Sequence, residues 1–423
     1  MTIGWPTQRR HSHTQYMLHC SNKLRYNPLS DGPVRTGLLD RRNARMRTLS
    51  NTIARLAAFR VPTPAVGIPA TVPALTELTD FGDNPGCLRA WTYVPETVRK
   101  KPPLVVVLHG CTQTAAGYNH GAGWSQLAEE QGFVLLFPEQ RRANNMNLCF
   151  NWYEPAHSRR DAGEPLSIKR MVDAMIAQHD VDPARLYING LSAGGAMTSV
   201  MLATYPEIFA GGAIIAGLPY GAARNVPEAF DRMRGHGGPN AAALAEAVRA
   251  ASPHRGPWPS ITVWHGSADQ TVVASNADAI VAQWRGVHGL PDAPDHEGAV
   301  DGYPHAVWRD PRGRPVIESY EITGMGHGTP LATRGDDACG VGGAYMLEVA
   351  ISSTRHIAAS WGLAPGSIVA AKPPRAARAR REPPAAATRA TILPSERTRA
   401  PKPALDAVSK VIEDALRAAG LMR

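Results

Sequence analysis

The stretch that decides the fold is Gly190-Leu-Ser192-Ala-Gly194-Gly195-Ala-Met197. It follows an apolar run at residues 186–188, which is typical of a short buried strand, and it begins a helix-length segment that extends to residue 205. A Gly-x-Ser-x-Gly sequence between a strand and a helix is typical of a nucleophile elbow, a turn so tight that only glycine lets the neighbouring backbones approach. We therefore expect the Ser192 hydroxyl to project over the carboxyl edge of a sheet.

On both sides of this turn, apolar runs of strand length alternate with segments of helix length. Short apolar strands separated by helices predict βαβ units and a mostly parallel central sheet flanked by helices, and the elbow makes this an α/β-hydrolase fold. Residues 222–258 and 288–315 are rich in Gly, Pro and His, which indicates insertions over the edge of the sheet. The expected strands are residues 88–94, 104–108, 133–137, 186–188, 213–216, 261–264 and 316–322, and the expected helices are 124–131, 166–179, 193–205, 274–287 and 344–361.

The 423 residues divide into one catalytic domain with flexible extensions at both ends. We expect an N-terminal extension over residues 1–75, with a short helix and a Pro-rich linker, and an α/β-hydrolase domain over residues 76–364. Residues 365–403 form a Pro/Ala/Arg-rich, disordered linker, and residues 404–423 carry the apolar stripe of a short amphipathic helix. A regular pattern begins only at Met46, which is an alternative start to Met1.

Charge and cysteine usage exclude several classes of protein. The net charge of +9 comes from the extensions, because residues 61–371 carry 22 basic and 29 acidic residues, a net charge of −7. No nucleic-acid partner is therefore expected. The five cysteines form no CxxC pair, so we expect no metal, and no apolar run is long enough to cross a membrane. No signal peptide is legible, which favours the cytoplasm, and the oligomeric state is left open.

A serine hydroxyl becomes a nucleophile only when a base takes its proton and a carboxylate orients that base. In α/β-hydrolases the acid and then the histidine follow later strands. Residues 261–264 are followed by a turn containing Asp269, and residues 316–322 are followed by a glycine-flanked loop containing His327. We therefore expect a catalytic triad of Ser192, Asp269 and His327.

Other acids and histidines fit this order less well. His265 precedes its turn and is interpreted as a structural hydrogen-bonding group, while Asp278 falls in the following helix. Asp301 and His305 lie in an insertion, and His109 lies upstream of the serine.

The tetrahedral intermediate of ester hydrolysis needs two N–H donors. One is expected from Ala193, the residue after the serine. The second is expected from the loop His109-Gly110-Cys111-Thr112, which follows the strand at 104–108.

Taken together, several motifs resemble those of the polyhydroxybutyrate depolymerase family of esterases, which are related to feruloyl and acetylxylan esterases. They extend over about residues 85–361 and include His109-Gly-Cys-Thr-Gln113, Cys149-Phe-Asn-Trp152, Gly163-Glu-Pro165, Gly190-Leu-Ser-Ala-Gly-Gly-Ala-Met197 and His265-Gly-Ser-Ala-Asp-Gln-Thr-Val272. The resemblance implies a Ser–Asp–His esterase that works through an acyl-enzyme without metal or organic cofactor. It assigns the second oxyanion donor to the Cys111 amide.

The resemblance also implies a substrate and a cleft. The substrate would be a poly- or oligo(3-hydroxybutyrate) or a related short-chain hydroxyacyl ester, and Trp152 would line the acyl cleft, although a buried core tryptophan is an equal alternative. Phe150 stands where many relatives have a second tryptophan, and Gly328-Thr-Pro-Leu-Ala follows His327 where many have Ala-Trp-Ser-Gly-Gly. No separate polymer-binding domain is visible, so soluble oligomers or small esters are as well supported as polymer.

Two other functions remain as alternatives. A feruloyl or acetylxylan esterase would use the same machinery with a different pocket. A more distant alternative is a basic-tailed binding protein whose hydrolase fold is inert.

Cys111 and Cys149 are expected at the same rim of the sheet, because each follows a predicted parallel strand. We therefore predict that they can form a disulfide that joins the oxyanion loop to the Trp152 loop. A disulfide would favour an oxidising compartment, as the family resemblance does by implying an extracellular location, whereas two reduced cysteines would fit the cytoplasm.

Overall fold

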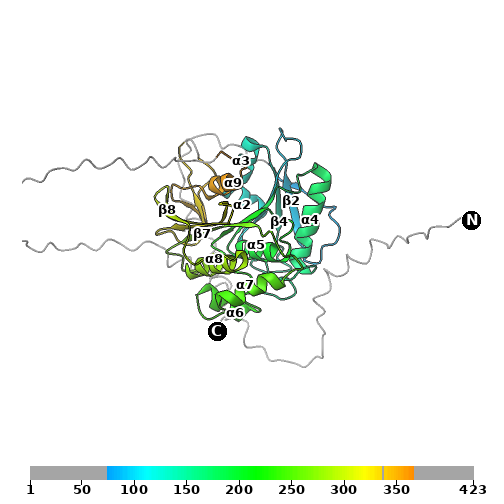
Figure 1. Cartoon of the computed structure of the whole chain (residues 1–423). Coiled ribbons are helices and arrows are strands. Elements are labelled where there is room, and N and C mark those ends of the chain that lie inside the picture. The colour runs from blue at the N-terminus through cyan, green and yellow to red at the C-terminus, as the bar shows by residue number, and fades with distance from the viewer. Residues whose placement is uncertain (1–73, 336–337, 366–423) are drawn as a thin grey trace, which may run out of the picture. The chain divides into compact units, whose positions relative to one another are not determined.

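The computed structural model describes residues 74–335 and 338–365 (Figure 1). These ranges contain nearly all of the segment predicted as the catalytic domain. The predictions for the N-terminal helix and linker, for the linker after residue 365 and for the C-terminal amphipathic helix concern residues outside this description. Among the described helices, none has the length and apolar character needed to cross a bilayer.

The described residues form a sheet of ten strands in the order β1-β2-β4-β3-β5-β6-β7-β10-β9-β8. The six central strands, β4-β3-β5-β6-β7-β10, run parallel to one another. Antiparallel strands extend the sheet on both sides: β2 and β1 beside β4, and β9 and β8 beside β10. The strands are β1 Thr76–Glu77, β2 Arg89–Tyr93, β3 Leu104–Leu108, β4 Val134–Glu139, β5 Leu186–Leu191, β6 Gly211–Ile215, β7 Ser260–Gly266, β8 His296–Val300, β9 Tyr303–Arg309 and β10 Pro315–Ile322. A separate parallel pair consists of β11 Thr329–Leu331 and β12 Met346–Glu348.

Helices cover both faces of the sheet, as Figure 1 shows for α2, α3 and α9 on one side and α5, α7 and α8 on the other. The described helices are α2 Ala115–Ala122, α3 Trp124–Gln131, α4 Gly163–His179, α5 Ala193–Thr204, α6 Val226–Met233, α7 Ala241–Ala250, α8 Ser275–His288 and α9 Ser353–Ser360. Every residue of α5 is buried, because this helix packs directly on β5 and β6. The predicted α/β-hydrolase fold is confirmed.

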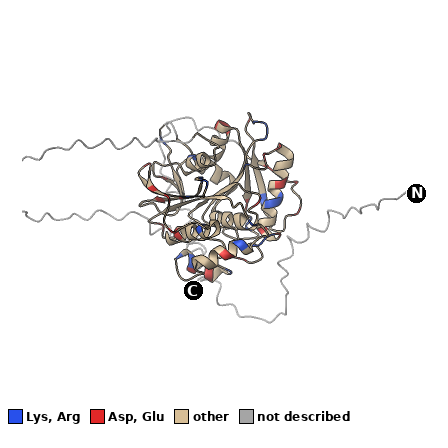
Figure 2. Cartoon of the chain, in the orientation of Figure 1, with Lys and Arg blue, Asp and Glu red and all other residues tan. Residues whose placement is uncertain are grey.

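The central strands divide their side chains between two hydrophobic clusters. In β3, Leu104, Val106 and Leu108 belong to the cluster beneath α4, α5 and α8, while Val105 and Val107 belong to the cluster beneath α2, α3 and α9. Successive side chains of a strand point to opposite faces, so an all-apolar strand needs cover on both sides. Figure 2 shows the complementary pattern, with charged residues on outer helices and loops and the central strands almost entirely uncharged.

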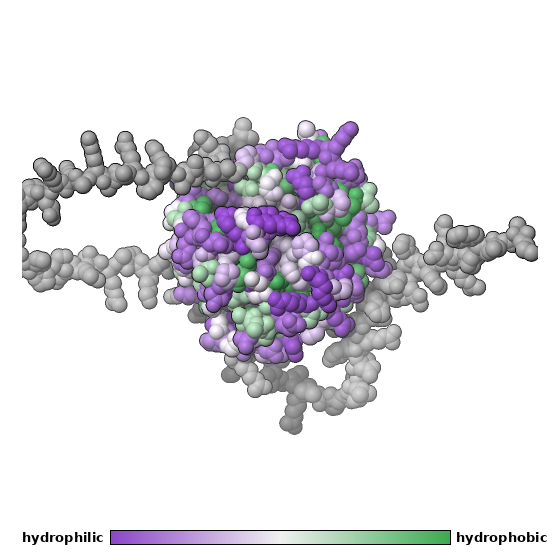
Figure 3. Space-filling view, viewed as in Figure 1, coloured by the Kyte–Doolittle hydropathy of each residue, from purple (hydrophilic) through white to green (hydrophobic). Residues whose placement is uncertain are grey.

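The face seen in Figure 3 is mostly hydrophilic, with small scattered hydrophobic areas. Among the described residues, the large hydrophobic side chains that are exposed are Val94, Met146 and Val341.

The prediction of one helix over residues 344–361 is wrong. Met346–Glu348 forms β12 and pairs with β11, and only Ser353–Ser360 is helical. The Ser352 side chain caps this helix by accepting from the Arg355 amide at 3.3 Å, so the helix begins only there.

The two segments interpreted as insertions contain regular structure. Residues 222–258 include α6 and α7, and α7 packs against α8. Residues 288–315 contain the β8–β9 hairpin, which pairs with β10 and continues the central sheet. Asp301 and Gly302 form its turn, both with positive φ, as expected for a two-residue hairpin turn. Neither strand has the continuous apolar run that identifies the central strands, because polar residues and a proline interrupt it.

Candidate active site

Ser192 lies at the junction between β5 and α5, where the sequence predicts the elbow. Its backbone has φ 56° and ψ −117°, a conformation that costs free energy for a residue with a side chain. Its amide donates to the Ile215 carbonyl at 2.9 Å, which ties the turn to the end of β6. The turn needs its glycines, because a Cβ at Gly194 would lie 2.4 Å from the Leu108 carbonyl oxygen, and one at Gly190 would lie 2.4 Å from the Gly194 carbonyl oxygen.

Asp269 and His327 are in direct contact. The His327 Nδ1 lies 2.7 Å from Asp269 Oδ2, and the Asp269 side chain is completely buried while that of His327 is 8% exposed. The other carboxylate oxygen, Oδ1, accepts from the Thr271 amide at 2.8 Å and the Val272 amide at 2.9 Å. A carboxylate accepts only, so Nδ1 carries the proton and Nε2 is left as an acceptor.

Backbone hydrogen bonds join the loop after β7, which carries Asp269, to the loop after β10, which carries His327. Gly266 pairs in register with Ile322 at the ends of β7 and β10. Beyond these strands, the Ser267 amide donates to Ile322 at 3.1 Å and the Ala268 amide donates to Met325 at 3.0 Å. A Cβ at Gly266 would lie 2.2 Å from the Met325 carbonyl oxygen, so glycine is needed for this close approach.

The other acids and histidines that could have been members of the triad lie elsewhere or form other contacts. The His265 Nε2 donates to the Val272 carbonyl at 2.7 Å and lies 3.5 Å from Asp269 Oδ2, and burial lowers the pKa of His265. His305 pairs with Glu318 on the neighbouring strand at 2.9 Å, and Asp301 pairs with His356 at 2.8 Å. Asp278 lies within α8.

The two candidate oxyanion donors come from adjacent strand ends, because Leu108 of β3 pairs with Gly190 of β5. Ala193 is the first residue of α5, and the amides of a first helical turn have no acceptor within the helix. The Cys111 amide has no hydrogen-bond partner within residues 74–335 and 338–365. Both amides are therefore available to a ligand.

The structure contains a disulfide between Cys111 and Cys149, the pair that the sequence analysis selects, with Cα atoms 4.3 Å apart. A second contact between the same loops is the hydrogen bond from the Thr112 amide to the Asn147 carbonyl at 2.6 Å. Cys339 is a free, buried thiol, and burial raises its pKa to about 11.

His109 connects the oxyanion loop to the end of β4 by hydrogen bonds. The Gln140 amide donates to His109 Nε2 at 3.1 Å, so the ring proton sits on Nδ1, which lies 2.8 Å from the Gly110 carbonyl and donates to it. The ring is buried, and this burial lowers the pKa of His109. A neutral imidazole therefore connects β4 to the residue before Cys111.

Glu164 was not identified as a site residue by sequence reasoning. Its buried carboxyl group accepts from the Gln140 side chain at 2.7 Å, the Asn151 side chain at 2.7 Å and the Asn151 amide at 2.9 Å. Burial raises the pKa of Glu164 to about 8. The only sequence signal was the Gly163-Glu-Pro165 motif, which carried the family resemblance but indicated no role.

Trp152 is 7% exposed and belongs to the larger hydrophobic cluster. Its ring lies edge-on to Tyr153, with centroids 5.5 Å apart. This burial fits a packing role in the loop, and a contact with substrate stays a prediction. Within the described residues, no group of three or more His, Cys, Asp or Glu side chains is arranged to hold a metal ion.

A serine at a strand–helix elbow, followed at later strand ends by a buried aspartate and a histidine bonded to it, defines the chain as an α/β-hydrolase. The family model described as Esterase PHB depolymerase matches residues 89–302, about half of the sequence. The chain belongs to this family of carboxylic ester hydrolases.

Individual relatives agree with this assignment. The chain is 44% identical over 316 residues to poly(3-hydroxyalkanoate) depolymerase C of Paucimonas lemoignei, with 74% of this chain and 76% of that protein aligned. It is 30% identical over 266 residues to feruloyl esterase B of Talaromyces funiculosus, with 61% and 74% aligned. The solved structure of acetyl xylan esterase from Aspergillus awamori matches with a TM-score of 0.56 at 28% identity, covering 60% of this chain and 94% of that one.

Proposed function

We propose that this chain is a serine esterase that hydrolyses short-chain hydroxyacyl esters, with Ser192 as nucleophile, His327 as base and Asp269 as the orienting acid. The observation that carries the proposal is the 2.7 Å contact between His327 Nδ1 and the buried Asp269. This contact lies at the carboxyl edge of the sheet, and the Ser192 elbow lies at the same edge. Because Asp269 binds the proton on Nδ1, the Nε2 atom is left to accept the proton of the serine hydroxyl.

The reaction proceeds through an acyl-enzyme. Ser192 attacks the ester carbonyl, and the amides of Cys111 and Ala193 bind the negative charge on its oxygen. His327 then gives its proton to the leaving alcohol, and a water molecule, activated by the same histidine, releases the acid. Asp269 stabilises the imidazolium formed in each half of the reaction.

The substrate assignment rests on the relative of 44% identity, which is named as a depolymerase of poly(3-hydroxyalkanoate). We propose that oligomers of 3-hydroxyalkanoates are hydrolysed here. The disulfide between Cys111 and Cys149 supports an oxidising, extracellular compartment, because such bonds persist there and are rare in the cytosol.

A feruloyl or acetylxylan ester is the second candidate, supported by the relatives of about 30% identity. The test is a substrate panel with the full chain: 3-hydroxybutyrate trimer, polymer particles, a feruloyl ester, acetylated xylan and p-nitrophenyl butyrate. We expect the highest kcat/KM on the trimer and no turnover by a folded Ser192→Ala variant. Preferred release of ferulate or acetate would select the second candidate. Turnover by the folded Ser192→Ala variant would contradict the mechanism.

A further inference from the structure

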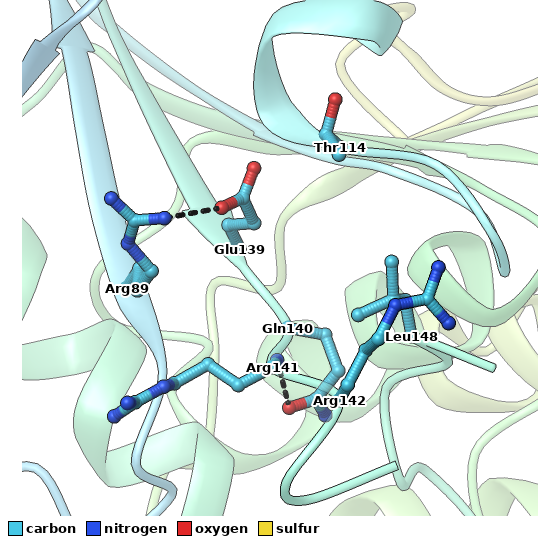
Figure 4. Close-up of a pocket in the computed structure, with 7 residues that line it drawn as sticks. All are labelled: Arg89, Thr114, Glu139, Gln140, Arg141, Arg142 and Leu148. Atoms are coloured by element: carbon cyan, nitrogen blue, oxygen red, sulfur yellow. Dashed lines mark hydrogen bonds and ion pairs between the residues drawn. The ribbon is translucent and has the colours of Figure 1, made fainter. Parts of the chain in front are cut away.

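A hollow of about 360 Å³ lies beside the oxyanion loop and has no part in the proposed chemistry. Figure 4 shows the ionic and apolar groups around it. The residues that matter for its chemistry are Arg89, Thr114, Glu139, Arg141, Arg142 and Leu148.

The hollow is at the same edge of the sheet as Ser192. Glu139 ends β4, which runs parallel to β3, and Arg89 begins the antiparallel β2 and pairs with Glu139 in register. Thr114 caps α2 just after the oxyanion loop, and Leu148 directly precedes the disulfide-bonded Cys149. Along this edge, the order is therefore the elbow after β5, the oxyanion loop after β3, and then the hollow at β4 and β2.

The one acidic residue that lines the hollow, Glu139, is already engaged by other groups of the chain. The Glu139 carboxylate accepts from the Trp91 indole at 3.1 Å and the Ala115 amide at 2.8 Å, and it pairs with Arg89 at 3.6 Å. Arg89 itself is fixed by Glu77 at 3.0 Å and lies over the Trp91 ring. Arg89 therefore balances one of two carboxylates, and Arg89, Glu77 and Glu139 together carry a net charge of −1.

Arg141 and Arg142 outweigh this charge and leave the hollow and its surroundings with a net charge of +1. Neither forms an ion pair with any residue in 74–335 or 338–365. Arg142 Nη1 donates to the Met146 carbonyl at 2.8 Å, and this bond holds the Arg142 guanidinium beside Leu148. The Arg141 side chain extends in the opposite direction, to the side of the hollow where Arg89 lies (Figure 4). A guanidinium with unused N–H groups binds a carboxylate well, because the two planar groups can form paired hydrogen bonds.

In a linear hydroxyacyl ester, the free carboxyl group is at the end of the leaving alcohol. We propose that this cationic hollow binds the terminal carboxylate of an oligoester whose internal ester is at Ser192. The inference rests on the proposed function and specifies the form of its substrate: a linear oligomer with a free acid end.

The spacing of the sheet sets the length of that substrate. Adjacent strands are about 4.8 Å apart, so the hollow, which lies two to three strands from β5, is roughly 10–14 Å from the elbow. A hydroxyacyl unit with a four-atom repeat spans roughly 4.5 Å, by scaling from the three-atom repeat of an extended peptide. Two or three units on the leaving side are therefore needed, and a dimer, with one, is too short.

The experiment measures binding to the full chain carrying Ser192→Ala, which cannot turn over the ligand. Calorimetry compares the free acid with the methyl ester of the 3-hydroxybutyrate dimer, trimer and tetramer, at low and high salt. We expect the acid of the trimer or tetramer to bind about five-fold more tightly than its ester, the upper range for an exposed ion pair. The difference should shrink at high salt and be absent for the dimer.

The variant Ser192→Ala/Arg141→Gln/Arg142→Gln should lose this preference for the acid. The matched control is Ser192→Ala/Arg312→Gln, because Arg312 is exposed just before β10, at the opposite edge of the sheet, and it should keep the preference. Equal binding of acid and ester, an equal preference for the dimer acid, or a preference that survives loss of both arginines would each overturn the proposal.

Failure of the proposed function has a different signature. A wild-type chain that cleaves p-nitrophenyl butyrate but no hydroxybutyrate oligomer contradicts the substrate assignment, and with it this assignment of the hollow. An active wild-type chain whose Ser192→Ala variant does not distinguish acid from ester contradicts the hollow alone.

Discussion

The loops after β7 and β10 and the loops after β3 and β4 meet at one edge of the sheet, but different contacts hold them. Around Asp269 and His327, backbone hydrogen bonds and the close approach at Gly266 continue the pairing of the two strands. Around the Cys111 amide, one backbone hydrogen bond from Thr112 to Asn147 is joined by side-chain contacts: a disulfide, His109 and the buried Glu164. The backbone contacts that hold the acid–base half contain no titratable or redox-active group, whereas the contacts that hold the oxyanion half include a disulfide and the buried Glu164 carboxyl.

The largest effect is expected from His327→Ala, which removes the proposed base. We expect kcat on a short activated ester to fall by about 10⁶-fold, and the Ser192→Ala/His327→Ala variant to lose about the same amount, because triad members act as a unit. Steady-state kinetics on folded variants check this. Losses that multiply would show that the two residues act independently.

Gly266→Ala tests whether backbone contact holds the acid–base half. The new Cβ would lie 2.2 Å from the Met325 carbonyl oxygen, so the histidine loop must move. We expect about a 10²-fold loss of kcat, typical of a displacement of about 1 Å, and a loss of about 1–3 kcal/mol in the free energy of unfolding.

Gly326→Ala is the matched control, because a Cβ there meets nothing within 4 Å. Equal kcat for the two variants would mean that the close approach at Gly266 does not set the position of His327.

Glu164→Gln tests the buried carboxyl group of the oxyanion half. Glutamine offers one oxygen where three N–H donors converge, so a buried donor is left without an acceptor, at a cost of about 1–3 kcal/mol in the free energy of unfolding. The exposed Glu154→Gln, in the loop that precedes α4, is the control.

The pH dependence of this cost has a definite sign. Burial raises the folded pKa of Glu164 from 4.5 to about 8, so the folded chain keeps a proton that the unfolded chain releases. Wild-type stability should therefore fall as the pH rises from 4.5 to about 8, and the glutamine variant should lack this slope. Denaturant titrations across this range measure it. Parallel pH curves would contradict a proton held by Glu164 in the folded state.

Reduction of the disulfide should have a smaller effect on catalysis. We expect kcat to fall a few-fold, well below the 10²–10³-fold cost of a lost oxyanion donor, because His109 and the Thr112 amide still support the loop. Assays with and without reductant measure this, and a Cys149→Ser variant should not respond to reductant. An undiminished kcat in fully reduced protein would show that the disulfide has no part in placing the Cys111 amide.

The smallest effect is expected from removing residues 1–60 and 366–423. Both halves of the site lie within the described residues, so kcat on short esters should stay within about two-fold of the full chain. Circular dichroism checks folding of the shortened chain. A folded but inactive product would place part of the site outside residues 61–365.

The positions of Ser192, Asp269 and His327 at strand ends could be predicted, because each follows a strand that the apolar pattern reveals and parallel strands bring their ends to one edge. The contacts of Glu164 and His109 could not be predicted, because their partners lie in loops whose shape no periodicity encodes. The β8–β9 hairpin could not be predicted because polar residues and a proline interrupt its apolar residues, and the helix predicted over residues 344–361 is too long because Met346–Glu348 gains its strand partner only in the folded chain.

The left-handed backbone of Ser192 lowers the stability of the fold at the position that supplies the nucleophile. A side chain at φ 56° costs about 1–3 kcal/mol, a cost that glycine would not carry. Glycine at this position would relax the turn and remove the nucleophile in one step. Selection for heat resistance alone would therefore favour an inactive protein, and only a requirement for turnover keeps serine at this strained position.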